Sequence, residues 1–310
     1  MQKAFLAILA IFFIMLFFDT SFYTSYNLID LLNSNSILLI LALGETIVLV
    51  AGGVDLSIGG VMTVSGIIAI QLINLNIPIP IAVLLSILVG AVIGAINGYI
   101  SVYHKTEPFI ITLGMGVILT GVAQQLTDYH PIACENPTFV NLANYKLFGQ
   151  VPSLVIVMLV LLLITYWVLR STSFGSNCYA IGGDFEVAKY SGIDVLKTKT
   201  LTYVISGVTA AIGGVMLSSH LNSGNSIYGE ITALYVACAV VVGGTSFAGG
   251  IGGAFKSAIG IILLGLLTNA FDMLKFDSYV PYLQSGLKGL VIVFIIWLDC
   301  YGRKIKREKV

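Results

Sequence analysis

Long apolar runs separated by short polar segments repeat along almost the whole chain. Ten of these runs are predicted to be helices, at about residues 4–18, 36–51, 58–73, 80–102, 108–127, 152–170, 199–218, 231–243, 254–274 and 280–299. A helix that crosses the hydrocarbon core of a bilayer needs roughly 20 mostly apolar residues. The pattern therefore predicts an all-α integral membrane protein with about ten transmembrane helices. No linker divides it, so residues 1–310 are expected to form a single transmembrane domain.

A glycine-rich segment that carries an acidic side chain joins the second and third runs. Asp55 stands between two glycine pairs, Gly52-Gly53 and Gly59-Gly60. A charge at bilayer depth costs on the order of 3 kcal/mol or more, and irregular backbone persists there only when it is buried in protein or lines a cavity. We therefore expect a broken or re-entrant segment packed in the core. The alternative is a short solvated turn between two ordinary helices.

A second glycine-rich segment, near the end of the chain, repeats the two glycine pairs at nearly the same spacing. It reads GGTSFAGG, with glycine pairs at Gly243-Gly244 and Gly249-Gly250, and it again follows an apolar run. Paired interruptions in two halves of a membrane protein point to a transport pathway built from an internal repeat. A chance echo is the alternative, because glycine supplies 33 of the 310 residues.

Composition excludes several classes of protein. Charged residues make up 10% of the chain and hydrophobic residues 57%, whereas soluble domains carry about 25% charge. The 15 basic and 15 acidic residues balance, and no basic patch suits nucleic acid. The cysteines lack CxxC spacing, and Cys178 falls in a charged loop. We expect neither a disulfide framework nor a metal site.

Basic residues flank the apolar runs unevenly. If ten spans are threaded through a membrane, most Lys and Arg fall on the side of the two termini, and Lys146 and Lys275 fall on the other. The positive-inside rule then predicts a multi-pass membrane protein with both termini cytoplasmic. The longest external loop is 128–151, and the longest internal loop, 171–198, holds most of the loop charge.

A short helix is predicted within the internal loop, over the sequence DFEVAKYSG at residues 184–192. Asp184 suits an N-cap and Gly192 the position just past a helix end. Two helical turns are not stable alone, so exposed Phe185 and Tyr190 need a partner surface; a solvated connector is the alternative. The residues assigned to this contact are Asp184, Phe185, Glu186, Ala188, Tyr190 and Gly192.

No group of residues has the arrangement of a catalytic site. The three histidines are far apart, and the sequence GGIGGAFKS fails as a phosphate-binding loop because Phe255 replaces a required glycine and no strand precedes it. We expect neither catalysis nor a nucleotide site in this chain. Polar residues within or beside apolar runs are instead candidates to line a solute path, with an interhelical hydrogen bond as the alternative for each. They are Glu45, Asp55, Ser57, Asn97 and Asn269.

Several motifs occur in order over nearly the whole chain. They are LGET (43–46) followed by GGVDLSIG (52–59), PFIITLGM (108–115), FG (174–175) with YAIGG (179–183), SGI (191–193) and VGGTSFAGG (242–250). Together they resemble the ribose-type, branched-chain-permease-like sugar permeases, which are membrane subunits of ATP-binding-cassette importers. Three residues, Glu45, Ala51 and Asp184, depart from the usual pattern of that group.

The resemblance implies a ten-helix permease that pairs with a second copy or with a paralogous permease. It also implies a cytoplasmic ATPase subunit, which binds ATP and Mg²⁺, an extracytoplasmic substrate-binding protein, and no cofactor in this chain. In this family the internal segment 184–192 would be the coupling helix that enters the ATPase. Pentoses, hexoses, inositol, nucleosides and furanone-type sugars all remain open as solutes. The rival hypothesis is a stand-alone ion- or proton-coupled transporter that uses Asp55 and Glu45.

Overall fold

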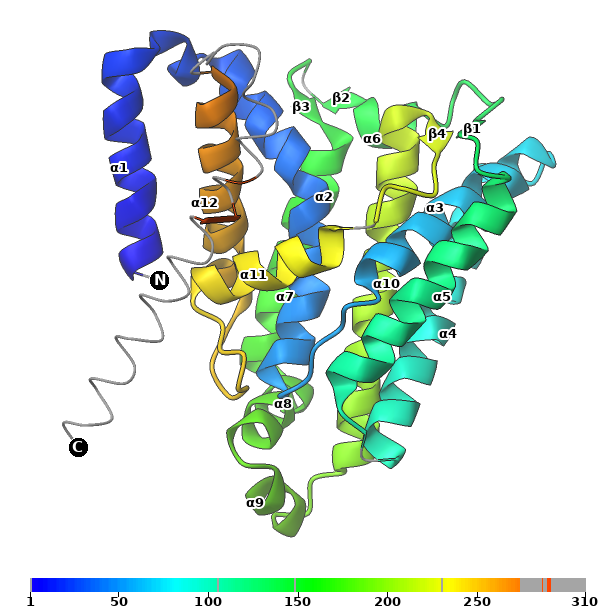
Figure 1. Cartoon of the computed structure of the whole chain (residues 1–310), viewed down its shortest axis with the longest axis vertical. Coiled ribbons are helices and arrows are strands. Elements are labelled where there is room, and N and C mark those ends of the chain that lie inside the picture. The colour runs from blue at the N-terminus through cyan, green and yellow to red at the C-terminus, as the bar shows by residue number, and fades with distance from the viewer. Residues whose placement is uncertain are drawn as a thin grey trace.

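The computed structural model describes residues 2–104, 106–147, 149–229 and 231–273, together with 286, 289 and 290. Over these residues the chain is almost entirely helical (Figure 1), which confirms the all-α prediction. The tenth predicted span, 280–299, lies almost wholly outside the described residues.

Nine helices of the described chain correspond to the first nine predicted spans. They are α1 (Gln2–Phe18), α2 (Ser25–Val50), α3 (Ile58–Asn74), α4 (Ile79–Tyr103), α5 (Pro108–Thr127), α7 (Ser153–Ser171), α10 (Val195–Leu221), α11 (Thr232–Gly243) and α12 (Ala254–Met273). Six of them, α2, α4, α5, α7, α10 and α12, are long and apolar enough to cross a membrane.

The shorter elements gather at the two ends of the bundle. A 3₁₀ helix, η1 (Thr20–Tyr23), joins α1 to α2. The predicted external loop holds α6 (Asn141–Asn144) and three strands, β1 (Ile132–Ala133), β2 (Lys146–Leu147) and β3 (Val151–Pro152), and β1 pairs with β4 (Ser223–Gly224). The predicted internal loop holds α8 (Ser173–Gly183) and α9 (Phe185–Tyr190), at the opposite end of the bundle (Figure 1).

One of the predicted spans, 231–243, forms a helix too short to cross the hydrocarbon core alone. The helix α11 has 12 residues, or about 18 Å of helix, against a hydrocarbon core of about 30 Å. Residues 225–229, which precede α11, are not helical. Neither are residues 51–57, which precede the 17-residue α3. The first break is therefore confirmed, but Gly59-Gly60 lie in the first turn of α3 rather than in the irregular backbone.

The helix α2 begins at Ser25, eleven positions earlier than the predicted start at residue 36. Thr24 caps it, because its hydroxyl accepts from the backbone N–H of Asn27 at 3.3 Å. The Asn27 amide in turn exchanges hydrogen bonds of 2.9 and 3.1 Å with Asn269 on α12. The apolar pattern missed this extension because its polar side chains find their partners within the fold.

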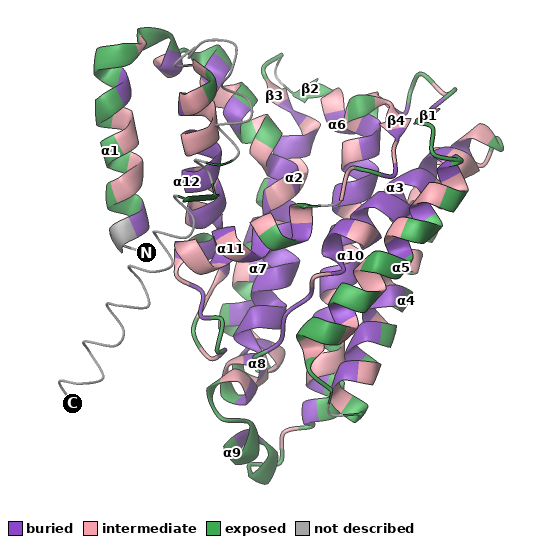
Figure 2. Cartoon of the chain, viewed as in Figure 1, coloured by how far each residue is buried: buried purple, intermediate pink, exposed green. Residues whose placement is uncertain are grey.

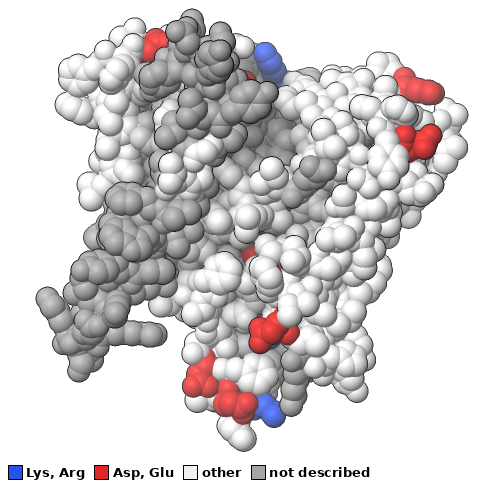
Figure 3. Space-filling view, in the orientation of Figure 1, with Lys and Arg blue, Asp and Glu red and all other residues white. Residues whose placement is uncertain are grey.

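The helix α10 forms the centre of the bundle and packs against α4, α3 and α2. Glycines allow the closest approaches: a Cβ added to Gly207 would collide with the carbonyl oxygen of Gly90, and one on Gly214 would collide with that of Met62. Buried residues concentrate on α2, α3 and α10, whereas α4 and α5 expose one side (Figure 2). Charged side chains gather towards the two ends of the face seen in Figure 3, and the surface between them is nearly uncharged. A membrane would surround that uncharged band.

The internal loop is more ordered than predicted, because α8 precedes the expected short helix. Thr172 caps α8 by accepting from the N–H of Gly175 at 3.1 Å. Cys178 was expected in a charged loop, but it is fully buried on the inner face of α8. Burial raises the pKa of its thiol to about 12, so the thiol stays protonated at neutral pH.

Candidate functional site

Four of the five predicted path residues come together in one buried cluster at the break between α2 and α3. The backbone N–H of Asp55 lies 3.3 Å from both carboxylate oxygens of Glu45. The Asp55 Oδ1 accepts from the N–H and hydroxyl of Ser57 at 3.0 and 2.6 Å, and Asn97 donates to the Ser57 hydroxyl at 2.8 Å. None of the four side chains is more than 1% exposed.

The cluster also binds α10, through residues that the sequence did not single out. Ser206 donates to Oδ2 of Asp55 at 2.8 Å, and the Tyr203 hydroxyl donates to the carbonyl of Val54 at 3.4 Å. Thr112 on α5 accepts from the N–H of Leu56 at 3.1 Å. Hydroxyl residues inside apolar helices were the available signal, but their spacing alone does not indicate which of them meet. The cluster thus connects the irregular segment to four helices, α2, α4, α5 and α10, and its buried side chains are closed to a solute in this conformation.

The two predicted glycine-rich breaks lie against each other. The N–H of Gly250 donates to the carbonyl of Val50 at 2.9 Å, and a Cβ on Gly249 would lie 2.9 Å from the Cα of Gly52. Gly52, Gly249 and Gly250 all have positive φ, at 71°, 90° and 71°, which only glycine adopts readily. The third partner, Gly182 of α8, stands so close that a Cβ there would collide with the carbonyl of Val50. The sequence predicted both breaks but not their contact or the role of Gly182.

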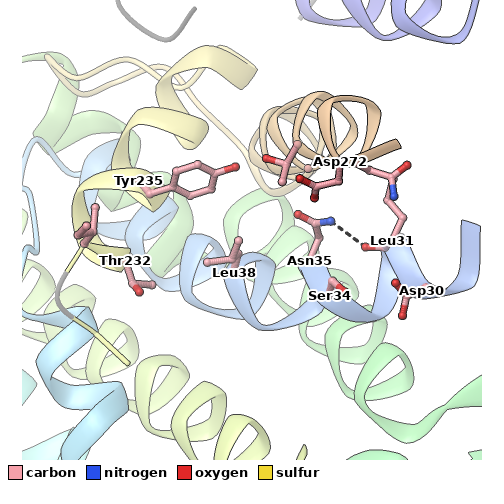
Figure 4. A pocket seen from close by; sticks show the side chains of 12 residues that line it. Asp30, Leu31, Ser34, Asn35, Leu38, Thr232, Tyr235 and Asp272 are labelled. Atoms are coloured by element: carbon pink, nitrogen blue, oxygen red, sulfur yellow. Dashed lines mark hydrogen bonds between the residues drawn. The ribbon is translucent and has the colours of Figure 1, made fainter. Parts of the chain in front are cut away.

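Asn269, the fifth predicted path residue, lies elsewhere. It lines a cavity of about 460 Å³ between α2, α11 and α12, together with Asp30, Asn35, Tyr235 and Asp272. Figure 4 shows Asn35 and Asp272 reaching from α2 and α12 into the space between these helices, with Tyr235 extending from α11 beside them. The volume falls in the usual range of small-molecule sites, about 300–1,000 Å³. This cavity is thus more accessible to a polar solute than the Asp55 cluster.

The predicted short helix of the internal loop is present as α9. Asp184 caps it by accepting from the N–H of Val187 at 3.0 Å, and Gly192 beyond its end has φ 82°. Ala188 is buried against the protein, whereas Phe185 is 43% and Tyr190 84% exposed. The helix is therefore held through Ala188, while the rings of Phe185 and Tyr190 stay largely exposed.

A cavity of about 640 Å³ lies between α9, the end of α4 and the start of α10. Phe185, Lys189 and Glu107 line it, as does Lys199, whose ammonium group donates to the carbonyl of Gly52 at 3.3 Å. Lys199 therefore joins the cavity beside α9 to the first glycine break.

The apolar helices, the interrupted spans and the buried polar cluster are those of a multi-pass membrane protein. Its relatives are named as bacterial transport permeases and not as enzymes, which assigns the chain to the bacterial inner membrane as a permease. Residues 27–296 match the family described as "Branched-chain amino acid transport system / permease component", and the chain belongs to that family.

Curated relatives span nearly the full length of this chain. The ribose import permease protein RbsC of Haemophilus influenzae is 31% identical over 304 residues, which cover 97% of this chain and 93% of the relative. RbsC of Bacillus subtilis is 34% identical, covering 96% and 93%. The L-arabinose transport system permease protein AraH of Escherichia coli K12 is 33% identical, covering 99% and 92%. Permeases of this kind are the membrane component that works with an ATPase and a substrate-binding protein.

Proposed function

We propose that this chain forms the transmembrane path of an ATP-binding-cassette importer for a monosaccharide of the pentose class. The observation that carries the proposal is α9, a capped two-turn helix whose Phe185 and Tyr190 protrude 43% and 84% exposed. A helix this short requires a partner surface to bury those rings. The ribose, arabinose and xylose named for relatives of similar length supply the solute class.

The cavity around Asn269 is proposed as this subunit's part of the solute path. Carboxylates such as Asp30 and Asp272 accept hydrogen bonds from sugar hydroxyls, and the amides of Asn35 and Asn269 both donate and accept. A neutral polyol suits this mixture, since it offers hydroxyl groups of both kinds. A second permease, identical or paralogous, would complete the path. The buried Asp55 cluster is then a structural junction between moving elements rather than a contact for the solute.

Movement would reach this path from the ATPase through α9. ATP and Mg²⁺ bind to the partner ATPase, on the cytoplasmic side with both termini of this chain. Displacement of α9 shifts the adjoining cavity and Lys199, which donates to the carbonyl of Gly52 at 3.3 Å. Gly52 contacts the second break, so a movement of α9 would be transmitted to both interrupted spans.

The buried pair of Glu45 and Asp55 favours one second candidate, a stand-alone ion- or proton-coupled transporter. Both carboxylates are at most 1% exposed, and the Glu45 carboxylate accepts from the backbone N–H of Asp55. An acidic pair of this kind inside a membrane protein is a common site for coupling ions. The two hypotheses differ in the energy source, which a transport assay identifies.

The proposal is tested by uptake in cells that express this chain with its partner ATPase and binding protein. Ribose, arabinose and xylose should compete with one another for uptake, and glucose, inositol and uridine should compete weakly. Asn269→Ala and Asp272→Asn should lower uptake, whereas Gln125→Ala, which removes an exposed amide outside the cavity, should leave it unchanged. Strong competition by the second group and none by the pentoses would refute the solute class.

A further inference from the structure

A third cavity, of about 670 Å³, lies where the end of α7, α8 and the start of α12 meet. The helix ends that line it lie at the α8–α9 end of the bundle (Figure 1), and it shares no lining residue with the Asn269 cavity or the cavity beside α9. Its walls include Tyr166 and Arg170 from α7, Tyr179 from α8, and Phe255 and Lys256 from α12.

The charge of this cavity is positive and uncompensated. Arg170 and Lys256 line it, and no acidic side chain does so among the described residues. Lys256 also stands in the first turn of α12, which contains no acidic residue. A cation there adds to the positive end of the helix dipole, an arrangement that an anion would relieve.

The walls of the cavity are fixed by contacts between its own residues. The guanidinium carbon of Arg170 lies 5.5 Å from the centre of the Tyr166 ring, and Arg170 also donates to the Tyr166 hydroxyl. Tyr166 meets Phe255 edge to face, with ring centres 5.0 Å apart. Tyr179 donates to the carbonyl of Gly252 at 3.1 Å. Arg170 is therefore held against an aromatic wall, and Lys256 lines the same cavity.

The neighbouring surface of α7 is apolar and exposed. Leu163, Ile164 and Trp167 are 58%, 49% and 60% exposed, just before Arg170 in the chain. Such residues suit contact with acyl chains, and a Trp near the end of a span suits the lipid headgroup level. The cavity thus has two cations that could bind an anionic group, and an exposed apolar surface of α7 lies beside it.

We propose that this cavity binds the phosphate headgroup of an anionic phospholipid in the cytoplasmic leaflet, with Arg170 and Lys256 as its ligands. The side of the membrane follows the orientation in the proposed function, but the binding itself does not depend on the transported solute. Basic pockets between transmembrane helices are a known means of holding such headgroups. The cavity wall includes Gly252 and Gly253, which closely follow the glycine break that bonds Val50. A bound lipid would therefore lie next to the contact between the two interrupted spans.

The test is a lipid titration of the purified full-length chain in detergent, read by native mass spectrometry. The probes are dioleoyl phosphatidylglycerol, dioleoyl phosphatidylcholine and glycerol 3-phosphate. Wild-type protein should bind phosphatidylglycerol in preference to phosphatidylcholine. Arg170→Gln and Lys256→Gln should each weaken phosphatidylglycerol binding about fivefold, and the double variant about 25-fold. The control Lys197→Gln removes an exposed cation at the same end of the bundle and should change nothing.

Each other outcome overturns the proposal. Equal binding of the two lipids by wild type would do so without any variant, as would an equal loss of binding in Lys197→Gln. Displacement of the lipid by millimolar glycerol 3-phosphate would identify a free phosphate ester as the ligand instead. If the glutamine variants aggregate, Arg170→Lys with Lys256→Arg keeps both charges and should retain the preference for phosphatidylglycerol.

Discussion

Ser206 and Asp55 lie 151 positions apart in the chain, and the Ser206 hydroxyl donates a 2.8 Å hydrogen bond to Oδ2 of Asp55. The bond fastens the non-helical segment after α2 to the central helix α10. With Ser57 on the other carboxylate oxygen, it satisfies an acidic group that would otherwise be costly inside a membrane protein. Asp55 therefore joins the non-helical segment to α10, and we assign it this structural role first.

Removing the Asp55 carboxylate should loosen this junction. Asp55→Ala leaves the hydroxyl of Ser206 and the N–H of Ser57 without their partner, which should cost about 1–3 kcal/mol for each unsatisfied group. We expect a lower midpoint of thermal unfolding in detergent and impaired solute uptake. The control is the neighbouring Leu56→Ile, which keeps the apolar volume and should be mild on both measures. Equal effects of the two substitutions would show that the carboxylate is not the junction.

The contact between the two glycine breaks predicts a difference between adjacent residues of α8. Gly182→Ala should destabilise the protein by about 1–3 kcal/mol, because its Cβ would collide with the carbonyl of Val50 and approach the N of Gly250 to 2.5 Å. Gly183→Ala is the matched control, since nothing lies within 4 Å of its Cβ position. Unfolding of both variants in denaturant gives the comparison. Similar stability of the two would mean that the breaks are not packed as described.

The exposed rings of α9 predict how the ATPase partner is held. Phe185→Ala or Tyr190→Ala should reduce the ATPase that co-purifies with the permease by about tenfold, as for an aromatic anchor in an interface, and should lower transport. The permease should still insert, because the Phe185 and Tyr190 side chains are 43% and 84% exposed and contribute little to its buried core. Tyr145→Ala, at the opposite end of the chain's bundle and 60% exposed, serves as control. Full ATPase binding with both α9 variants would refute the coupling assignment.

The external loop predicts where the substrate-binding protein docks. Charge reversal by Glu135→Lys or Lys146→Glu should slow association with that protein, most strongly at low ionic strength, because exposed charges steer encounter. Folding should be unaffected, since Glu135 uses only its backbone N–H to contact Asn74. The measurement is surface plasmon resonance on the reconstituted permease, with Lys197→Glu at the other end as control. Unchanged association by both variants would leave the loop as a passive connector.

The sequence predicted most of the helices because apolar runs report burial in lipid or protein directly. It predicted the first break because paired glycines around an acidic residue at membrane depth favour irregular backbone that is buried in protein. It failed where polar side chains are satisfied by distant partners, as with Asn27 and Asn269 at the start of α2. It also placed Cys178 in a loop, because the apolar pattern of α8 is too weak to reveal a short buried helix.

The candidate path residues illustrate the same limit. Intramembrane polar residues could be named from the sequence, but their grouping depends on which helices pack together. Glu45, Asp55, Ser57 and Asn97 share one buried cluster, and Asn269 lines a cavity between other helices. Ser206 and Tyr203 were missed because the sequence does not indicate which group a hydroxyl in an apolar helix will contact. Their partners are known only once α10 is placed at the centre of the bundle.

The most direct measurement of the central claim is pentose uptake into proteoliposomes that contain this chain with its ATPase and binding protein. The account predicts uptake that requires ATP on the ATPase side, persists when gramicidin collapses Na⁺ and H⁺ gradients, and falls with Phe185→Ala. Uptake by this chain alone, driven by an ion gradient and indifferent to ATP, would contradict it and assign Glu45 and Asp55 to ion coupling.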